Sequence, residues 1–173
     1  MKGTNSFVAV LMGSDVDLPT MQATLDVLEK LGIRMEVRIT SAHRTPEATH
    51  TYVKDAEARG CAVFIAAAGL AAHLAGTVAA LTTKPVIGVP MESGPLSGMD
   101  ALLSTVQMPG GIPVACVAIG TAGAKNAAYL AAEILALGNA DLGMRLKQER
   151  AESAGKILEK DRGLQQRLSK QSS

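Results

Sequence analysis

The sequence is poor in aromatic side chains: its 173 residues include no tryptophan, two tyrosines and two phenylalanines. Proteins that bind single-stranded nucleic acid stack bases on exposed aromatic rings, so this composition argues against such a platform. The charge is nearly balanced, with 17 lysine and arginine residues against 16 aspartate and glutamate residues. A chain without a broad positive field is not expected to capture a phosphate backbone. We therefore expect no nucleic-acid partner.

Cysteine and long apolar runs are also scarce. Cys61 and Cys116 are the only cysteines, and each lies in an apolar run. This usage excludes a disulfide framework and favours small core residues in a reducing compartment. No apolar run is long enough to span a bilayer, and residues 1–6 are too short and polar for a signal peptide. We expect a cytoplasmic protein with no membrane partner.

The chain is rich in short apolar runs that alternate with helical patterns. Hydrophobic residues make up 47% of the sequence, which is enough for a core. The strands predicted from these runs are residues 7–12, 33–39, 62–67, 85–89 and 113–119. The predicted helices are residues 20–31, 46–59, 69–80, 100–106 and 122–137, the second with Thr45 as N-cap and Pro46 at its first position. This alternation predicts a three-layer α/β/α sandwich around a parallel, flavodoxin- or Rossmann-like sheet of about five strands.

The end of the chain differs from the rest. Residues 1–138 are predicted to form a single α/β catalytic domain, and the charge density rises in residues 139–173. Five apolar residues fall near one stripe of a possible long helix, namely Leu142, Leu146, Ile157, Leu164 and Leu168. The pattern leaves two interpretations open: a helix that lies on its own domain, or an arm that lies on a neighbouring subunit.

Three segments with chemically useful residues follow predicted strands, and the ends of parallel strands meet at one edge of a sheet. The first is residues 13–17, in which Ser14 and the following helix start suit a phosphate and Asp17 suits ribose hydroxyls. An ordinary strand-to-helix turn capped by Ser14 or Asp17 is the alternative. The segment is neither a Walker loop nor the dinucleotide fingerprint.

The second segment, residues 41–46, places an imidazole and a guanidinium side by side before a helix. His43 can both donate and accept a proton near neutral pH, and Arg44 suits bidentate phosphate binding. The third segment, residues 66–76, is built of small residues that allow a planar ligand to approach the backbone, and it contains His73. The two histidines have no thiol or carboxylate ligands at zinc-like spacing, so no metal site is expected.

Taken together, the three segments resemble the class I PurE family, the N5-carboxyaminoimidazole ribonucleotide mutases. The resemblance covers residues 7–137 in order, and SAHRTPE at residues 41–47 is its most specific part. MGSDVDLPTM at residues 12–21 looks like the family's phosphate and ribose loop, and AGLAAHLAG at residues 68–76 looks like its AGGAAHLPG loop. Residues 85–90, 96–114 and 122–135 add further support.

The resemblance implies a reaction and a set of site residues. The reaction converts N5-carboxyaminoimidazole ribonucleotide (N5-CAIR) to 4-carboxy-5-aminoimidazole ribonucleotide (CAIR) in purine (IMP) biosynthesis, by decarboxylation and recarboxylation, with no metal and no organic cofactor. His43 is implied as the proton shuttle, and His73 as a second catalytic residue that shapes the carboxyl site. The implied substrate-binding residues are Ser14, Asp17, Ser41, Ala42, Arg44, Ala68, Gly69, Leu70, Ala72 and Leu74. An octamer with the C-terminal helix on a neighbour is also implied, which favours the arm.

The sequence departs from the family pattern at four positions. Val16 stands in place of a serine, Leu18 in place of a common aromatic residue, Leu70 in place of a glycine and Ala75 in place of a proline. None of these changes removes a proton-transfer group, so the expected activity stands. The loss of a serine hydroxyl at Val16 bears instead on affinity for the phosphate or ribose.

Two other functions remain as alternatives. One is direct carboxylation of aminoimidazole ribonucleotide by CO2, although animal-type members with that activity typically carry lysine at the position of Arg44 and lack the stretch that contains His73. The other is a flavodoxin-like nucleotide-binding module without catalysis. Turnover of N5-CAIR distinguishes all three.

Overall fold

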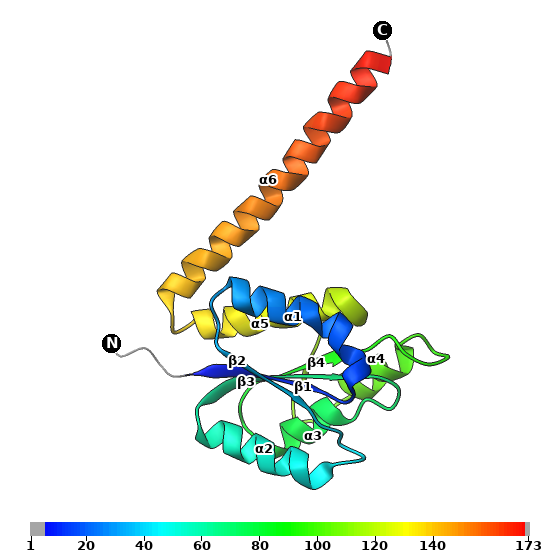
Figure 1. Cartoon of the computed structure of the whole chain (residues 1–173), viewed down its shortest axis with the longest axis vertical. Helices are drawn as coiled ribbons and strands as arrows, with labels where there is room; N and C mark the ends of the chain where they lie inside the picture. Colours follow the sequence, from blue (N-terminus) through cyan, green and yellow to red (C-terminus); the bar gives the residue numbers. More distant parts are fainter. Residues whose placement is uncertain (1–5, 172–173) are drawn as a thin grey trace. The chain divides into compact units, whose positions relative to one another are not determined.

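A computed structural model describes residues 6–171 and has a five-stranded parallel sheet in the order β2-β1-β3-β4-β5 (Figure 1). The strands are β1 (Phe7–Met12), β2 (Met35–Ile39), β3 (Cys61–Ala68), β4 (Val86–Pro90) and β5 (Ala115–Cys116). Every neighbouring pair is parallel, and residues Val37, Val10, Ile65 and Ile87 lie in register across four strands. The predicted α/β class with about five parallel strands is confirmed.

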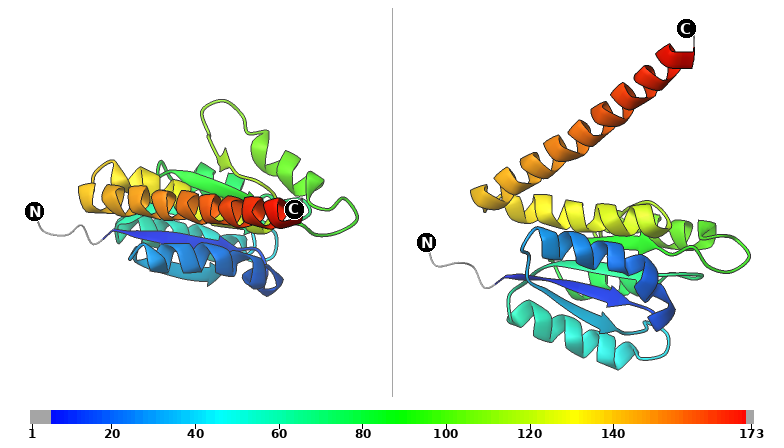
Figure 2. Two further views of the ribbon diagram at one scale, coloured as in Figure 1. Left: turned by 90° about the horizontal axis from the view of Figure 1, so that it is seen from above. Right: turned by 45° about the horizontal axis from the view of Figure 1, so that its top comes forward.

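Helices cover both faces of this sheet. The elements are η1 (Asp15–Asp17), α1 (Leu18–Lys30), α2 (Pro46–Ala58), α3 (Leu74–Leu81), α4 (Met99–Val106) and α5 (Gly120–Ala136). Helices α1 and α5 lie on one face, where the hydroxyl of Thr24 donates to the carbonyl of Ala124 at 2.7 Å, and α2 and α3 lie on the other (Figures 1 and 2). The three-layer sandwich is therefore confirmed.

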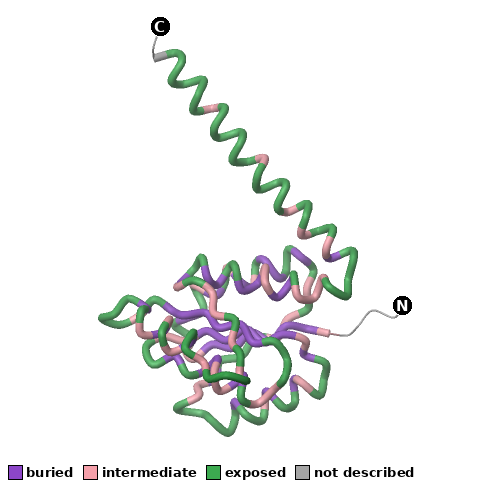
Figure 3. Tube along the Cα trace, turned by 180° about the vertical axis from the view of Figure 1, so that it is seen from behind, coloured by how far each residue is buried: buried purple, intermediate pink, exposed green. Residues whose placement is uncertain are grey.

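The central strands are apolar along their whole length because both of their faces are covered. All six residues of β1 are buried, and so are most residues of β3 (Figure 3). On the α2 and α3 face, Phe7, Leu11 and Phe64 form a cluster with the helices. On the opposite face, Val8 and Ile65 are completely buried. The largest contribution to stability thus comes from apolar area removed from water in two layers.

Two predicted elements are shorter than expected. The strand predicted at residues 113–119 is reduced to the two residues of β5 at the sheet edge. The chain then enters α5 at Gly120, where φ is +71°. The helix predicted from residue 69 begins only at Leu74. Leu70 has φ of +54°, which a right-handed helix does not permit. Residues 69–73 therefore form a loop, which leaves them free to line a cavity.

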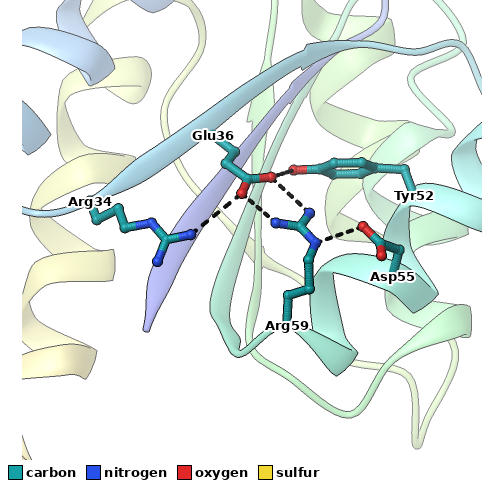
Figure 4. A network of polar contacts seen from close by, with 5 residues as sticks. All are labelled: Arg34, Glu36, Tyr52, Asp55 and Arg59. Atoms are coloured by element: carbon teal, nitrogen blue, oxygen red, sulfur yellow. Dashed lines mark hydrogen bonds and ion pairs between the residues drawn. The ribbon is translucent and has the colours of Figure 1, made fainter. Parts of the chain in front are cut away.

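An ionic network joins the edge strand β2 to α2 (Figure 4). The Glu36 carboxylate accepts from Nη2 of Arg59 at 2.9 Å and from the Tyr52 hydroxyl at 3.2 Å, and Arg34 lies 3.7 Å away. The hydrogen bonds from Arg59 hold the pKa of Glu36 below its usual value. Burial of the Tyr52 hydroxyl, together with the charge of Glu36, raises the pKa of Tyr52. The network secures an edge strand whose Val37 and Ile39 remain exposed.

The two cysteines have different environments. Cys61 is buried at the start of β3, and burial raises its pKa to about 11. Cys116 in β5 is only half-buried. Both are free thiols, so the prediction of small core residues is confirmed for Cys61 and only partly for Cys116.

The chain divides into two compact units, and the boundary falls between Ile134 and Leu135. The sequence predicts the end of the α/β domain after residue 138, and that domain division stays a prediction. The second unit contains one long helix, α6 (Ala140–Gln171). Of the predicted apolar stripe, Ile157, Leu164 and Leu168 are exposed, whereas Leu142 is only 2% exposed and Leu146 is half-buried. The stripe is therefore accessible to water only in the later part of the helix. Within residues 6–171, no helix combines the length and the apolar character that crossing a membrane requires.

The packing of α3 and α4 against β4 depends on Gly88. A Cβ atom there would lie 2.3 Å from Thr105 Cγ2 and 3.2 Å from Ala75 Cβ. We expect Gly88→Ala to lower the free energy of unfolding by about 1–3 kcal/mol, as overpacked cores do. Gly138→Ala is the control, since no atom lies within 4 Å of its Cβ position. Adding Thr105→Ser should recover part of the loss in urea denaturation, and no recovery would contradict this contact.

Candidate active site

The loops that follow β1, β2, β3 and β4 meet at one edge of the sheet and enclose a pocket of about 540 Å³. This edge is where ligands bind in open α/β folds. The pocket is lined by Gly13, Ser14, Val16, Asp17, Ser41, Ala42, His43, Arg44, Ala68, Gly69, Leu70, Ala71, His73, Leu74 and Ser93. All the predicted site residues except Ala72 are among them. The three sequence segments therefore form one site.

Ala72 is the exception because its side chain is packed in the interior. It is only 2% exposed and does not line the pocket, whereas its neighbours Ala71 and His73 do. In a loop, successive side chains do not share one direction, so a motif cannot show which of its members faces a ligand. The prediction of Ala72 as a substrate-binding residue is thus not supported by its position.

His43 and His73 are in direct contact. The Nε2 atom of His43 lies 2.7 Å from Nδ1 of His73, and the two rings are edge to face with centroids 4.8 Å apart. A hydrogen bond at this distance requires one nitrogen to carry the proton and the other to present its lone pair. The pair therefore shares one proton between facing atoms, which is an arrangement suited to moving a proton.

His73 is positioned by the start of α3. Its backbone N–H donates to the carbonyl of Ala71 at 2.8 Å, and its own carbonyl accepts from the N–H of Thr77 at 2.9 Å. His43 comes from the loop after β2, so the contact joins two loops of the sheet edge. Because His73 is fixed to a helix, it limits the directions in which the His43 ring can turn.

The loop that carries His43 and Arg44 is held by its own hydroxyl groups. Ser41 Oγ accepts from the backbone N–H of Arg44 at 3.1 Å, and Thr45 Oγ1 accepts from the N–H of Ser41 at 2.9 Å. Thr45 occupies the N-cap position of α2, but its side chain does not cap the helix as predicted, because it bonds back to Ser41. Arg44 donates to the carbonyl of Gly13 at 3.2 Å and so ties this loop to the one after β1.

The loop after β1 combines the half-buried hydroxyl of Ser14 with a buried carboxyl group. Ser14 is the N-cap of η1, and its oxygen accepts from the N–H of Val16. Asp17 is 7% exposed, and burial raises its pKa, with the neighbouring Asp15 adding to the effect and a hydrogen bond from the Ser14 backbone opposing it. A carboxyl group kept in such surroundings without a strong cationic partner is a feature of functional sites.

The departures from the family motif fall partly inside the pocket. Val16 lines it and is 75% exposed, and Leu70 lines it and is 53% exposed. Ala75, by contrast, is buried in α3 and contributes to the core, and Leu18 begins α1 outside the lining. Two of the four departures thus place apolar surface where a ligand would bind.

Ser93 is the pocket residue that the sequence analysis missed. It follows β4 at a distance of three residues, in the same relation to its strand as the other segments have to theirs. Its position after a predicted strand was the available signal, but the preceding PVIGVP motif contains no polar group that would have drawn attention to it. Within residues 6–171, no group of three or more histidine, cysteine or acidic side chains is placed to hold a metal ion.

Comparison with known proteins gives a consistent picture. A family model described as AIR carboxylase matches residues 7–156. The chain is 49% identical to the N5-carboxyaminoimidazole ribonucleotide mutase of Thermotoga maritima, over 92% of each chain. It is 52% identical to the mutase of Pseudomonas aeruginosa, over 90% of this chain and 95% of the relative. The crystal structure of Treponema denticola PurE superposes with a TM-score of 0.81 at 34% identity, over 90% of this chain and 96% of that one.

The burial of Asp17 generates a prediction about stability. Since its pKa is raised in the folded state, the protein binds that proton more tightly than the unfolded chain does, and stability falls as pH rises through the raised pKa. Asp17→Asn should therefore be more stable than wild type at pH 7, with the difference vanishing below about pH 4, near the ordinary aspartate pKa. Urea denaturation across this range measures it. The control is Asp26→Asn, which changes an exposed carboxylate on α1. If the Asp17→Asn protein is no more stable than wild type at pH 7, the argument is refuted.

Proposed function

The chain belongs to the AIR carboxylase family, and from this membership and the pocket we propose that it is an N5-carboxyaminoimidazole ribonucleotide mutase. It is an isomerase of purine biosynthesis that moves a carboxyl group from the exocyclic nitrogen N5 to ring carbon C4. The structural observation that carries the proposal is the 2.7 Å contact between His43 and His73 in a pocket that also holds Arg44.

The reaction adds one proton to N5 and removes one proton from C4. Breaking the bond between N5 and the carboxyl carbon requires a proton on N5, and it releases CO2. C4 then attacks the CO2, and the proton on C4 must leave. Histidine is the side chain that both gives and takes protons near neutral pH, whereas Arg44 keeps its proton. His43 donates to N5 in the first half and recovers a proton from C4 in the second.

His73 supports this cycle through its contact with His43. Its Nδ1 atom faces the Nε2 atom of His43, so the tautomer of one ring determines which nitrogen of the other is protonated. His73 also borders the small-residue loop that includes Ala68 and Gly69. The released CO2 is held in this region, where the scarcity of polar groups reduces competition from water.

The remaining polar residues anchor the ribonucleotide. Arg44 and Ser14 lie on neighbouring loops and bind the phosphate, with the N–H groups at the start of η1. Asp17 binds the ribose hydroxyls. The aminoimidazole ring is enclosed by Leu70, Leu74, Ser41 and Ala42. Such contacts remote from the reacting atoms fix the ring against His43 and lower the entropic part of the barrier.

The assembly we propose is a cytoplasmic homo-octamer in which α6 lies on a neighbouring subunit. Helix α4 supports self-association, because Met99, Leu103 and Val106 recur at helical spacing and are 47–52% exposed. Leu96 just before this helix is also exposed. A second copy of the chain removes these side chains from water, and the stripe on α6 gains a partner in the same way.

The decisive test of the proposed reaction is a spectrophotometric turnover assay with N5-CAIR, run with EDTA and without ATP. We expect full activity, since no step above uses a metal or a nucleotide triphosphate. Activity only with aminoimidazole ribonucleotide and CO2 would identify a direct carboxylase instead. Binding of nucleotide without turnover of either substrate would identify a non-catalytic module.

The role of His43 leads to a quantitative prediction. His43→Asn keeps similar size but cannot shuttle a proton, so turnover should fall by about 10²–10⁴-fold, the usual loss for a general acid–base group, while nucleotide binding persists. His73→Asn should lower turnover by a smaller factor. His50→Asn, which alters an exposed histidine of α2, is the control and should match wild type. If His43→Asn turns over within a few-fold of wild type, His73 becomes the proton carrier.

Deleting the C-terminal residues tests whether α6 lies on a neighbouring subunit. A chain that ends at Gly138 lacks α6 and should form a smaller assembly or become insoluble, because apolar side chains on the neighbour lose their cover. Static light scattering gives the mass of wild type and truncated protein side by side. A truncated protein of unchanged subunit number and stability would show that α6 does not hold subunits together.

A further inference from the structure

The side chain of Ser93 has an unusual environment. Its Oγ atom is buried and, among the described residues, has no hydrogen-bond partner. Leaving a buried hydroxyl unpaired is unfavourable, and each such group in a folded protein calls for an explanation. Ser93 also lines the pocket. A hydroxyl left unpaired at the wall of a binding pocket is explained if its partner is a ligand atom.

The loop that carries Ser93 is fixed on the loop after β3. The backbone N–H of Met91 donates to the carbonyl of Ala68 at 2.9 Å. A Cβ on Gly69 would lie 2.1 Å from Ser93 Oγ, so the two residues pack together only because Gly69 has no side chain. Leu70 lies over Gly94 in the same way, with its Cδ2 atom 2.5 Å from the Cβ position. Ser93 is therefore held beside residues 68–70.

We propose that the Ser93 hydroxyl donates a hydrogen bond to the carboxyl group that the reaction moves. This proposal rests on the proposed mutase function and adds a substrate-binding residue to it. In the free protein the oxygen packs under Gly69. The proposal requires a rotation about the Cα–Cβ bond to another staggered position that brings the oxygen to the cavity. That rotation breaks no hydrogen bond, because the hydroxyl makes none in its present position.

The strand order distinguishes the carboxyl group from the phosphate as the partner. Arg44 follows β2 and Ser14 follows β1, whereas Ser93 follows β4, on the other side of β3. Neighbouring strands are about 4.8 Å apart, so the loops after β2 and β4 start roughly 14 Å from each other. The phosphate anchors and Ser93 therefore occupy opposite ends of the pocket, and a ribonucleotide bound by its phosphate presents its ring end to Ser93.

The neutral character of the donor suits the chemistry. Arg44 is the one arginine or lysine side chain in the pocket lining, and it lies at the phosphate end. An arginine or lysine at the carboxyl end would keep its charge, stabilise the carboxylate of the substrate and oppose its departure as neutral CO2. Only interactions that strengthen toward the transition state accelerate a step. A neutral hydroxyl orients the carboxyl group and stabilises its negative charge less strongly than a cation does.

Paired ligands test this assignment. Dissociation constants are measured by calorimetry for CAIR, which carries the carboxyl group, and for aminoimidazole ribonucleotide, which lacks it. Ser93→Ala should raise the dissociation constant of CAIR by roughly ten- to a hundredfold, as expected for the loss of one hydrogen bond to a charged group. The dissociation constant of aminoimidazole ribonucleotide should stay within about twofold of the wild-type value. Ser104→Ala is the matched control, since its hydroxyl bonds within α4 and lies outside the lining.

The free energy of unfolding provides a second measurement. Ser93→Ala removes an unpaired buried oxygen, so the free energy of unfolding should be unchanged or higher. If the hydroxyl had a structural role, its removal would lower the free energy of unfolding. Equal weakening of both ligands, or no weakening of CAIR, overturns the assignment of Ser93 and leaves the mutase function intact. Wild-type protein that binds neither ligand overturns the proposed function, and the assignment with it.

Discussion

The polarity of the parallel strands is the constraint on which the rest of this structure depends. In a parallel sheet every strand ends at the same edge, and neighbouring strands are only about 4.8 Å apart. Since helices cover both faces, polar side chains in the strands themselves would be buried without partners. The chemically active groups are thus confined to the loops at that edge. The order β2-β1-β3-β4 then places four such loops around one pocket.

Within that pocket the loops have different chemical characters. The loops after β1 and β2 supply charge and hydroxyl groups, whereas the loop after β3 is made of small residues that leave room for a ligand. His73 belongs to the apolar loop but faces His43 of the polar one, so their contact lies where the two kinds of surface meet. In the reaction proposed above, a proton carrier at this border reaches a ring whose phosphate is bound on one side and whose carboxyl group is enclosed on the other.

Several features of the site are unfavourable for stability. Asp17 is a buried carboxyl group, Ser93 has an unpaired hydroxyl, and Leu70 has a backbone conformation that suits glycine. All three line the same pocket, while the core of β1 and β3 contains none of them. Local violations of good packing are expected where ligands bind, because groups prepared for a ligand cannot also be satisfied without one. Their cost is offset by the two apolar layers around the sheet.

The sequence by itself determined the alternation of strands and helices, the family resemblance and the three segments of the site, because these depend on local spacing and on motifs. It did not show that His43 and His73 touch, since they are 30 residues apart and meet only when β1 lies between β2 and β3. Nor did it show that Ser93 belongs to the pocket or that Ala72 does not. Which side chain of a loop faces a cavity is decided by the packing of neighbouring loops, and that packing exists only in the folded chain.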